Sequence, residues 1–159
     1  GVFWAVSIVL VLTHLLTAVG FLGVLAADPH RGQRAARITL WIAVVGFVLL
    51  GVAELLSATI GREDVESSAA GSVGTVFGIA SLMTALGGVV AGVVIVRTHA
   101  WTGLGAWMVL ASGVTMLVLV TPANISGDTV PRTLALVVWS LTFIPLGRTI
   151  ARSASDTPG

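Results

Sequence analysis

Residues 38–60 read ITLWIAVVGFVLLGVAELLSATI, a run of 23 residues in which Glu54 is the only formally charged side chain. A helix needs about 20 predominantly apolar residues to cross the roughly 30 Å hydrocarbon core of a bilayer. Runs rich in Val and Ile also occur in buried strands, but an uninterrupted length above about 20 residues favours a helix. The stretch therefore predicts a transmembrane helix that carries one carboxyl group.

One further apolar stretch precedes this one in the sequence, and three follow it. Together they predict an all-α, polytopic membrane bundle of five helices, organised as one transmembrane domain over residues 1–150 with a polar cytoplasmic tail over residues 151–159. The predicted spans are residues 2–26, 38–60, 72–96, 100–121 and 131–150. Arg132 and Arg148 bound the uncharged part of the last span, and Pro145, near the inner end of the span, predicts a kink that leaves the span intact.

The composition of the whole chain agrees with a membrane protein. Its 159 residues are 56% hydrophobic and 9% charged, with a mean hydropathy of +1.05, whereas soluble domains carry about 25% charged residues. The chain has no Cys, which excludes disulfides and thiolate chemistry. A net charge of +1 gives no indication of nucleic-acid binding. All eight basic residues are Arg, so no lysine Schiff base can form.

The distribution of arginines predicts the orientation. Arg31, Arg34, Arg37, Arg97, Arg148 and Arg152 all fall on one side of the five predicted spans, and Arg62 and Arg132 fall on the other. Because cytoplasmic loops are enriched in basic residues, the N-terminus is expected outside and the C-terminus inside. The cluster of Arg31, Arg34 and Arg37 is a candidate for contacts with lipid head groups, although its role in topology is the simpler explanation.

Two titratable side chains are predicted within the membrane. Counted from the inner boundary, His14 lies roughly 21 Å up the first span and Glu54 roughly 25 Å up the second. The two spans are antiparallel neighbours, so an ion pair or a shared proton is possible. The same count predicts a polar layer in the outer half of the membrane; the candidate site comprises His14, Glu54, Ser57, Ser81, Thr84, Ser112 and Thr115.

Three interpretations of Glu54 remain open at this point. A modest tilt would carry its carboxylate to the outer interface, where it would be an ordinary hydrated side chain. A second interpretation is a structural pair with His14. The third is a working site for a proton, an ion or a cofactor, which is the default hypothesis for an ionisable group inside a membrane.

The third predicted span carries small side chains along one face. Their spacing of three and four residues forms a helix-packing seam, made of Gly74, Gly78, Ser81, Ala85, Gly88 and Gly92. Such seams let two helix backbones approach closely. The seam predicts either packing within the monomer, with this helix at its centre, or an interface with another chain.

Deep in two other spans, Trp107 and Trp139 are predicted to be packing residues.

No motif predicts catalysis, a metal site or a cofactor. The sequence has no Gly-x-x-x-x-Gly-Lys loop, no Gly-x-Ser-x-Gly turn and no His-Glu-x-x-His pair. A haem held by two histidines would need a second histidine at the depth of His14, whereas His30 and His99 fall in predicted loops. We therefore expect neither an enzyme nor a resident cofactor, and no metal ligands or catalytic residues are assigned.

The order of several short motifs resembles that of small, uncharacterised multi-spanning membrane proteins of the actinobacterial type. The motifs are Thr13-His14-Leu15-Leu16, Gly20-Phe21-Leu22-Gly23, the Arg-rich loop followed by Gly46 and Glu54, Gly88 to Arg97, Trp101 with Gly103, Thr121-Pro122, Trp139 and Gly147-Arg148. The resemblance implies a multi-pass protein of the bacterial inner membrane. It also implies one more helix before Val2, in keeping with a first residue that is not Met.

Three functions follow from these patterns as hypotheses. The first is an accessory or structural subunit of a larger membrane complex, which would contact lipids and either other subunits or copies of itself through helix packing. The second is a small transporter, channel or sensor that uses the polar site around His14 and Glu54. The third is a haem-binding or quinone-binding membrane protein.

Overall fold

The computed structural model describes residues 2–27, 32–60, 68–99, 101, 103–126 and 129–155, and every element among these residues is a helix. The elements are α1 (Val2–Ala26), α2 (Arg34–Ile60), α3 (Ser68–Thr98), α4 (Leu104–Thr115), the π-helical segment η1 (Met116–Val120), α5 (Thr121–Ser126), α6 (Thr129–Leu141) and α7 (Phe143–Ser155). They form five helical spans that are long and apolar enough to cross a membrane.

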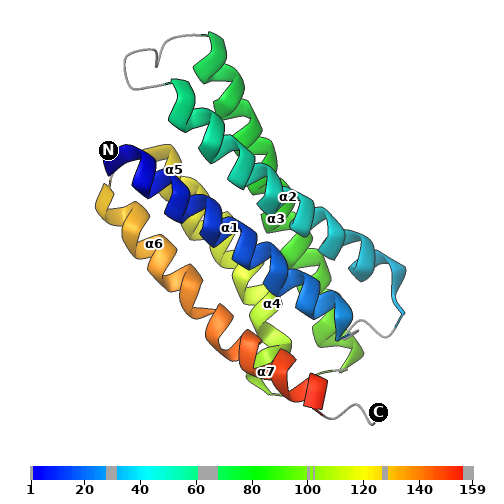
Figure 1. Cartoon of the computed structure of the whole chain (residues 1–159). Helices are drawn as coiled ribbons and strands as arrows, with labels where there is room; N and C mark the ends of the chain where they lie inside the picture. Colours follow the sequence, from blue (N-terminus) through cyan, green and yellow to red (C-terminus); the bar gives the residue numbers. More distant parts are fainter. Residues whose placement is uncertain are drawn as a thin grey trace.

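The helices form an elongated bundle in which sequence neighbours pack side by side (Figure 1). The most extensive contact joins α2 to α3, followed by those of α1 with α2 and of α3 with α4; α7 then packs on α4. We call the end of the bundle where α2 finishes and α3 begins the α2–α3 end, and the opposite end the α3–α4 end. At the α2–α3 end, α2 and α3 stand apart from α1 and α6 (Figure 1).

Glycines set the separation of the three central helices. A Cβ atom at Gly46 of α2 would lie 2.8 Å from the Thr84 methyl group of α3, and one at Gly87 would lie 2.6 Å from the Thr39 carbonyl oxygen. On the other side of α3, a Cβ at Gly88 would lie 3.1 Å from the Cα of Gly113 in α4. Since a Cβ at any of these positions would be too close, glycine permits backbone-to-backbone packing here.

An aromatic cluster ties the last two helices to the first two. The rings of Phe21 and Phe47 have centroids 5.3 Å apart, Phe47 and Trp139 are stacked at 5.9 Å, and Trp139 meets Phe143 edge-on at 4.9 Å. Offset and edge-to-face pairs of this kind are worth about 0.5–1.5 kcal/mol each beyond the area they bury. The cluster confirms that Trp139 is a packing residue.

Trp107, by contrast, is not a packing residue. Its side chain is 54% exposed on the outside of α4, so the sequence-based expectation for it was wrong. An indole ring in a membrane-facing position needs no protein neighbours, because lipid tails solvate its apolar body.

The last two spans are less regular than their sequences predict. Residues 116–120 form a π-helical turn, in which the Thr121 hydroxyl donates to the Met116 carbonyl oxygen at 2.9 Å. Pro122 follows directly and has no N–H to donate into the helix ladder. π-Helical turns of this kind are typical insertions in α-helices and recur at functional sites.

The fifth span is divided at Thr142, three residues before Pro145. Both the amide and the hydroxyl of Thr142 donate to the Trp139 carbonyl oxygen, at 3.1 and 2.6 Å. Pro145 cannot donate to the carbonyl four residues back, at Leu141, and its ring crowds that carbonyl. The span is preserved as residues 130–152, but the break lies near its midpoint, not near one end. Beyond the span, α7 continues to Ser155 into the expected tail, while residues 156–159 lie outside the described residues.

A leucine at Gly113 tests the role of glycine in packing α3 on α4. A Cβ there would collide with the backbone of Val89 and Gly88, and overpacking of this kind costs about 1–3 kcal/mol or more. We expect Gly113→Leu to lower the free energy of unfolding, measured by denaturant titration in mild detergent micelles, by at least about 2 kcal/mol. Gly71→Leu is the matched control, because a Cβ at Gly71 meets no atom within 4 Å; equal losses in both variants would contradict the packing role.

Candidate functional site

Glu54 is buried in the bundle, with 9% of its surface exposed. It lies on α2 one turn after Gly51, on the side of α2 that faces α1. A Cβ atom at Gly51 would lie 3.9 Å from both the His14 Cβ and a Val11 methyl group. Gly51 therefore faces α1 at the depth of His14, about 4–5 Å from the depth of Glu54, and a Cβ there would make ordinary van der Waals contact.

His14 makes its hydrogen bond within its own helix. Its Nδ1 lies 2.7 Å from the Leu10 carbonyl oxygen, and since a carbonyl can only accept, Nδ1 carries the proton. The Nε2 atom is then left with its lone pair whenever the ring is neutral. Among the described residues no hydrogen bond or ion pair joins His14 directly to Glu54, although the two helices bring both residues to the same interface.

Ser7 belongs to the same interface, and sequence reasoning missed it. It lies seven residues before His14 on α1, hence on the same helix face, and only 4% of it is exposed. The antiparallel contact of His14 with Gly51 puts Ser7 level with the turn of α2 that contains Ser57, which is half-buried. The seven-residue spacing from His14 was the signal that would have identified it.

Several oxygens of these residues form no hydrogen bond within the part of the chain that the structure describes. In the described part of the chain, neither the Ser7 hydroxyl nor the Glu54 carboxyl forms a hydrogen bond, and the same holds for Ser57. Buried polar groups are nearly always hydrogen-bonded to protein, water or a ligand. We call Ser7, His14, Glu54 and Ser57, from α1 and α2, the Glu54 cluster.

Arg132 brings a third helix to the Glu54 cluster. It lies in the first turn of α6, where it is exposed, and it interacts electrostatically with the Glu54 carboxyl group. The stack of Trp139 on Phe47 holds α6 against α2 and so brings the guanidinium towards the carboxyl group. Buried or half-buried charges in membrane spans typically have such a partner.

The remaining predicted site residues do not share the depth of Glu54. Thr84 packs on Gly46, eight residues before Glu54 on α2 and so about 12 Å away along the axis. Ser112 precedes Gly113, which contacts Val89, about 8 Å further along α3 from Thr84. Thr84 and Ser112 donate to carbonyl oxygens of Ser81 and Val109 in their own helices, both at 2.8 Å, while Thr115 is half-buried at the end of α4. The expected single polar layer is thus spread along the bundle.

The small-residue seam of α3 has two different halves. Towards the α3–α4 end, Gly113 of α4 packs on Ala85 and Gly88, and Gly92 packs on Leu110. Towards the α2–α3 end, Gly74 and Gly78 are exposed, and a Cβ at either would meet nothing within 4 Å. One half therefore serves packing within the monomer, and the other half is open.

The described residues contain no group of three His, Asp or Glu side chains that could hold a metal ion. His99 stands exposed just after α3, with its Nδ1 2.9 Å from the Arg97 carbonyl oxygen, at the opposite end of the bundle from Ser7. Of the arginines expected at lipid head groups, Arg34 and Arg37 are exposed in the first turn of α2, and Arg31 lies outside the described residues.

Comparisons with known protein families, with characterised proteins and with solved structures find no match to this chain. Its function must therefore be argued from the geometry of the helices themselves.

The link between Glu54 and Arg132 can be measured by a double-mutant cycle. If the two charges interact as their placement indicates, Glu54→Gln and Arg132→Gln will be non-additive by about 0.5–1 kcal/mol in the free energy of unfolding. Unfolding in mixed detergent micelles gives the free energies of unfolding of the wild type, the two single variants and the double variant. Arg148→Gln, at the other end of the fifth span, should add to Glu54→Gln within about 0.3 kcal/mol. Additivity for Arg132 as well would refute the link.

Proposed function

We propose that this protein is an accessory or structural subunit of a larger complex in the bacterial inner membrane, with its N-terminus outside and its C-terminus inside. The observation that carries the proposal is the open half of the α3 seam, formed by Gly74 and Gly78 together with Gly71 one turn earlier. All three glycines are exposed, and in the described part of the chain no atom outside the local helix backbone lies within 4 Å of the place where a Cβ would stand.

Glycine at these positions gives the monomer no packing advantage. It lowers helix stability by about 1 kcal/mol per residue relative to alanine, and lipid tails pack equally well on larger side chains. The same seam gains close backbone contact with α4 at Gly88 and Gly92. A second helix lying on Gly74 and Gly78 would gain close backbone contact in the same way. That second helix would belong to another subunit or to a second copy of this chain.

The orientation and location rest on charge and on the resemblance of the sequence. Arg34 and Arg37 are exposed in the first turn of α2, as arginines at a cytoplasmic surface are expected to be. Both could contact anionic lipid head groups there.

Leucines at Gly74 and Gly78 test the subunit function. After extraction from the native membrane in mild detergent, the wild-type protein should migrate as a complex larger than the monomer, and the variant with both leucines should migrate as the monomer. The variant with leucines at Gly20 and Gly147 is the matched control, because those glycines also have open space around them, on a different face; it should remain in the complex. A wild-type protein that migrates alone would overturn the proposal, and the masses of the released chains distinguish a foreign subunit from a second copy.

We also propose a second candidate, a small transporter, channel or sensor, because the buried carboxyl group of Glu54 forms no hydrogen bond in the described part of the chain. A carboxyl group that no protein donor satisfies is suited to receiving water, a proton or a cation within the membrane. Ser7, Ser57 and the Nε2 of His14 supply further polar atoms at the same interface. Arg132 offers the carboxylate a counter-charge when nothing is bound.

Proton flux into proteoliposomes tests this second function. The wild-type protein should dissipate an imposed proton gradient faster than empty liposomes do, and Glu54→Gln should slow the protein-dependent flux at least about tenfold if proton transfer uses that carboxyl group. Thr84→Ala serves as the control, because its hydroxyl lies well away from Glu54 and bonds within its own helix. Equal flux in wild type and Glu54→Gln would exclude a transport role for this residue.

A further inference from the structure

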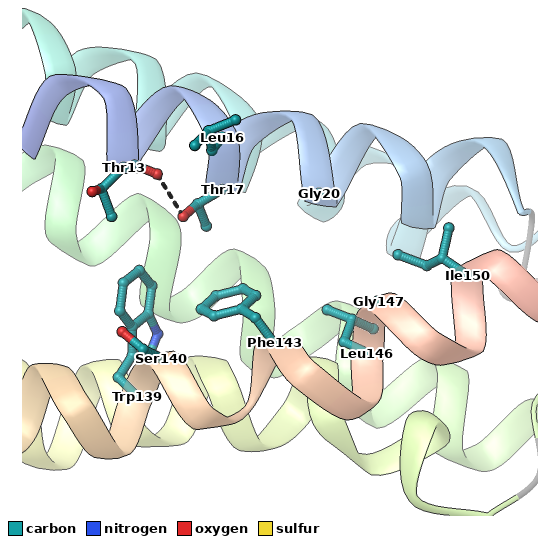
Figure 2. Close-up of a pocket in the computed structure, with 10 residues that line it drawn as sticks. All are labelled: Thr13, Leu16, Thr17, Gly20, Trp139, Ser140, Phe143, Leu146, Gly147 and Ile150. Carbon is teal, nitrogen blue, oxygen red and sulfur yellow. Dashed lines mark hydrogen bonds between the residues drawn. The ribbon is translucent and has the colours of Figure 1, made fainter. Parts of the chain in front are cut away.

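A groove of about 310 Å³ lies between α1 and the two halves of the fifth span. One wall is α1, with Thr13, Leu16, Thr17 and Gly20, and the other is formed by α6 and α7 (Figure 2). The groove is closed at one end, where Ile150 of α7 reaches α1 and its methyl group lies 3.4 Å from a Cβ position at Gly23. It opens sideways towards the lipid, since Leu16, Ser140 and Gly147 are exposed along its rim. Its volume falls within the range of small-molecule sites, about 300–1,000 Å³.

Two glycines keep this groove open. Gly20 on α1 and Gly147 on α7 line it from opposite sides (Figure 2), and a Cβ at either position would meet no atom within 4 Å. Neither glycine brings two backbones into contact, in contrast to Gly88 and Gly92. Their effect is to leave room beside the rings of Trp139 and Phe143, which form the aromatic part of the lining.

Polar groups gather in the middle of the groove. Thr13 and Thr17 lie near the midpoint of the first span, and Trp139 and Ser140 lie near the midpoint of the fifth. The three hydroxyls donate to carbonyl oxygens in their own helices at 2.7–2.8 Å, which leaves their lone pairs free to accept. The Trp139 side chain is 95% buried, and its indole N–H has no hydrogen-bond acceptor among the residues that the structure describes.

These features restrict the chemistry of an occupant. An occupant that is apolar over most of its length can lie along Leu146 and Ile150, and a flat ring can lie beside Trp139 and Phe143. The occupant must also offer a hydrogen-bond acceptor to the indole N–H, because a buried indole N–H normally has one. Phospholipid ester carbonyls lie near the membrane surface, about 15 Å from the midplane, so an acyl chain would reach the groove without supplying this acceptor. We propose that the groove binds a prenylated quinone, with its ring carbonyl at Trp139 and its isoprenoid tail extending into the lipid.

Nanodiscs of one defined phospholipid give a direct test. A benzoquinone with two isoprene units should bind the full-length protein saturably, above its partition into empty nanodiscs of the same lipid. Gly20→Leu and Gly147→Leu, which fill the groove without meeting protein atoms, should each weaken binding at least tenfold. Trp139→Phe keeps the ring but removes the N–H, and it should weaken binding about 2–10-fold, as expected for one hydrogen bond.

The variant with leucines at Gly74 and Gly78 is the matched control, because it carries the same substitution on the open face of α3, and its affinity should equal that of the wild type. Binding no greater than partition into empty nanodiscs would overturn the proposal, as would wild-type affinity in Gly20→Leu. A phospholipid that co-purifies with the wild type, is lost in Gly20→Leu and is not displaced by the quinone would assign the groove to an acyl chain instead. Loss of the native complex in the Gly20 and Gly147 variant would assign the groove to a partner helix.

Discussion

The backbones of α2, α3 and α4 touch at glycines, and this contact fixes the depth of the groups on these three helices relative to one another. Gly46 and Gly87 set the register of α2 on α3, while Gly88 and Gly113 set that of α3 on α4. Because helices packed at this separation cannot slide without a collision, Thr84 is held level with Gly46 and Glu54 is held about 12 Å nearer to the α2–α3 end. The positions of Thr84 and Ser112 therefore follow from the packing of small residues, and their hydroxyls bond within their own helices.

The five spans could be predicted from hydropathy alone, since the length of an apolar run is a direct consequence of bilayer thickness. The breaks within these helices depend on single residues, whose effects are lost when hydropathy is averaged over a window. Pro145 predicts a distortion, but its place is set by the Leu141 carbonyl, which loses its donor, and by the capture of the Trp139 carbonyl by Thr142. Thr121 and Pro122 together carried a comparable signal for the π-helical turn, in which Thr121 bonds back to Met116.

The candidate site was predicted less completely, because side-chain direction and helix register are tertiary properties. Sequence placed His14 and Glu54 at similar depth, and the contact at Gly51 brings their helices together there. Sequence alone did not predict that Ser112 and Glu54 lie at different depths, because depth was counted along each span separately from its own boundary. Ser7 escaped notice because its seven-residue spacing from His14 becomes informative only once the face of α1 that His14 occupies is known. The same is true of Arg132, whose relation to Glu54 exists only once the fifth span is folded against α2.

The division of the fifth span at Thr142 also has a mechanical consequence. A continuous helix transmits a displacement from one end to the other like a rigid rod, whereas an interrupted one bends where its hydrogen-bond ladder is broken. Here α6 is fastened by the stack of Trp139 on Phe47, and α7 is fastened separately by its contacts with α4 and by Ile150 against α1. The break at Thr142 therefore gives the fifth span a place to bend, while the edge-on contact of Trp139 with Phe143 keeps α6 and α7 linked across it.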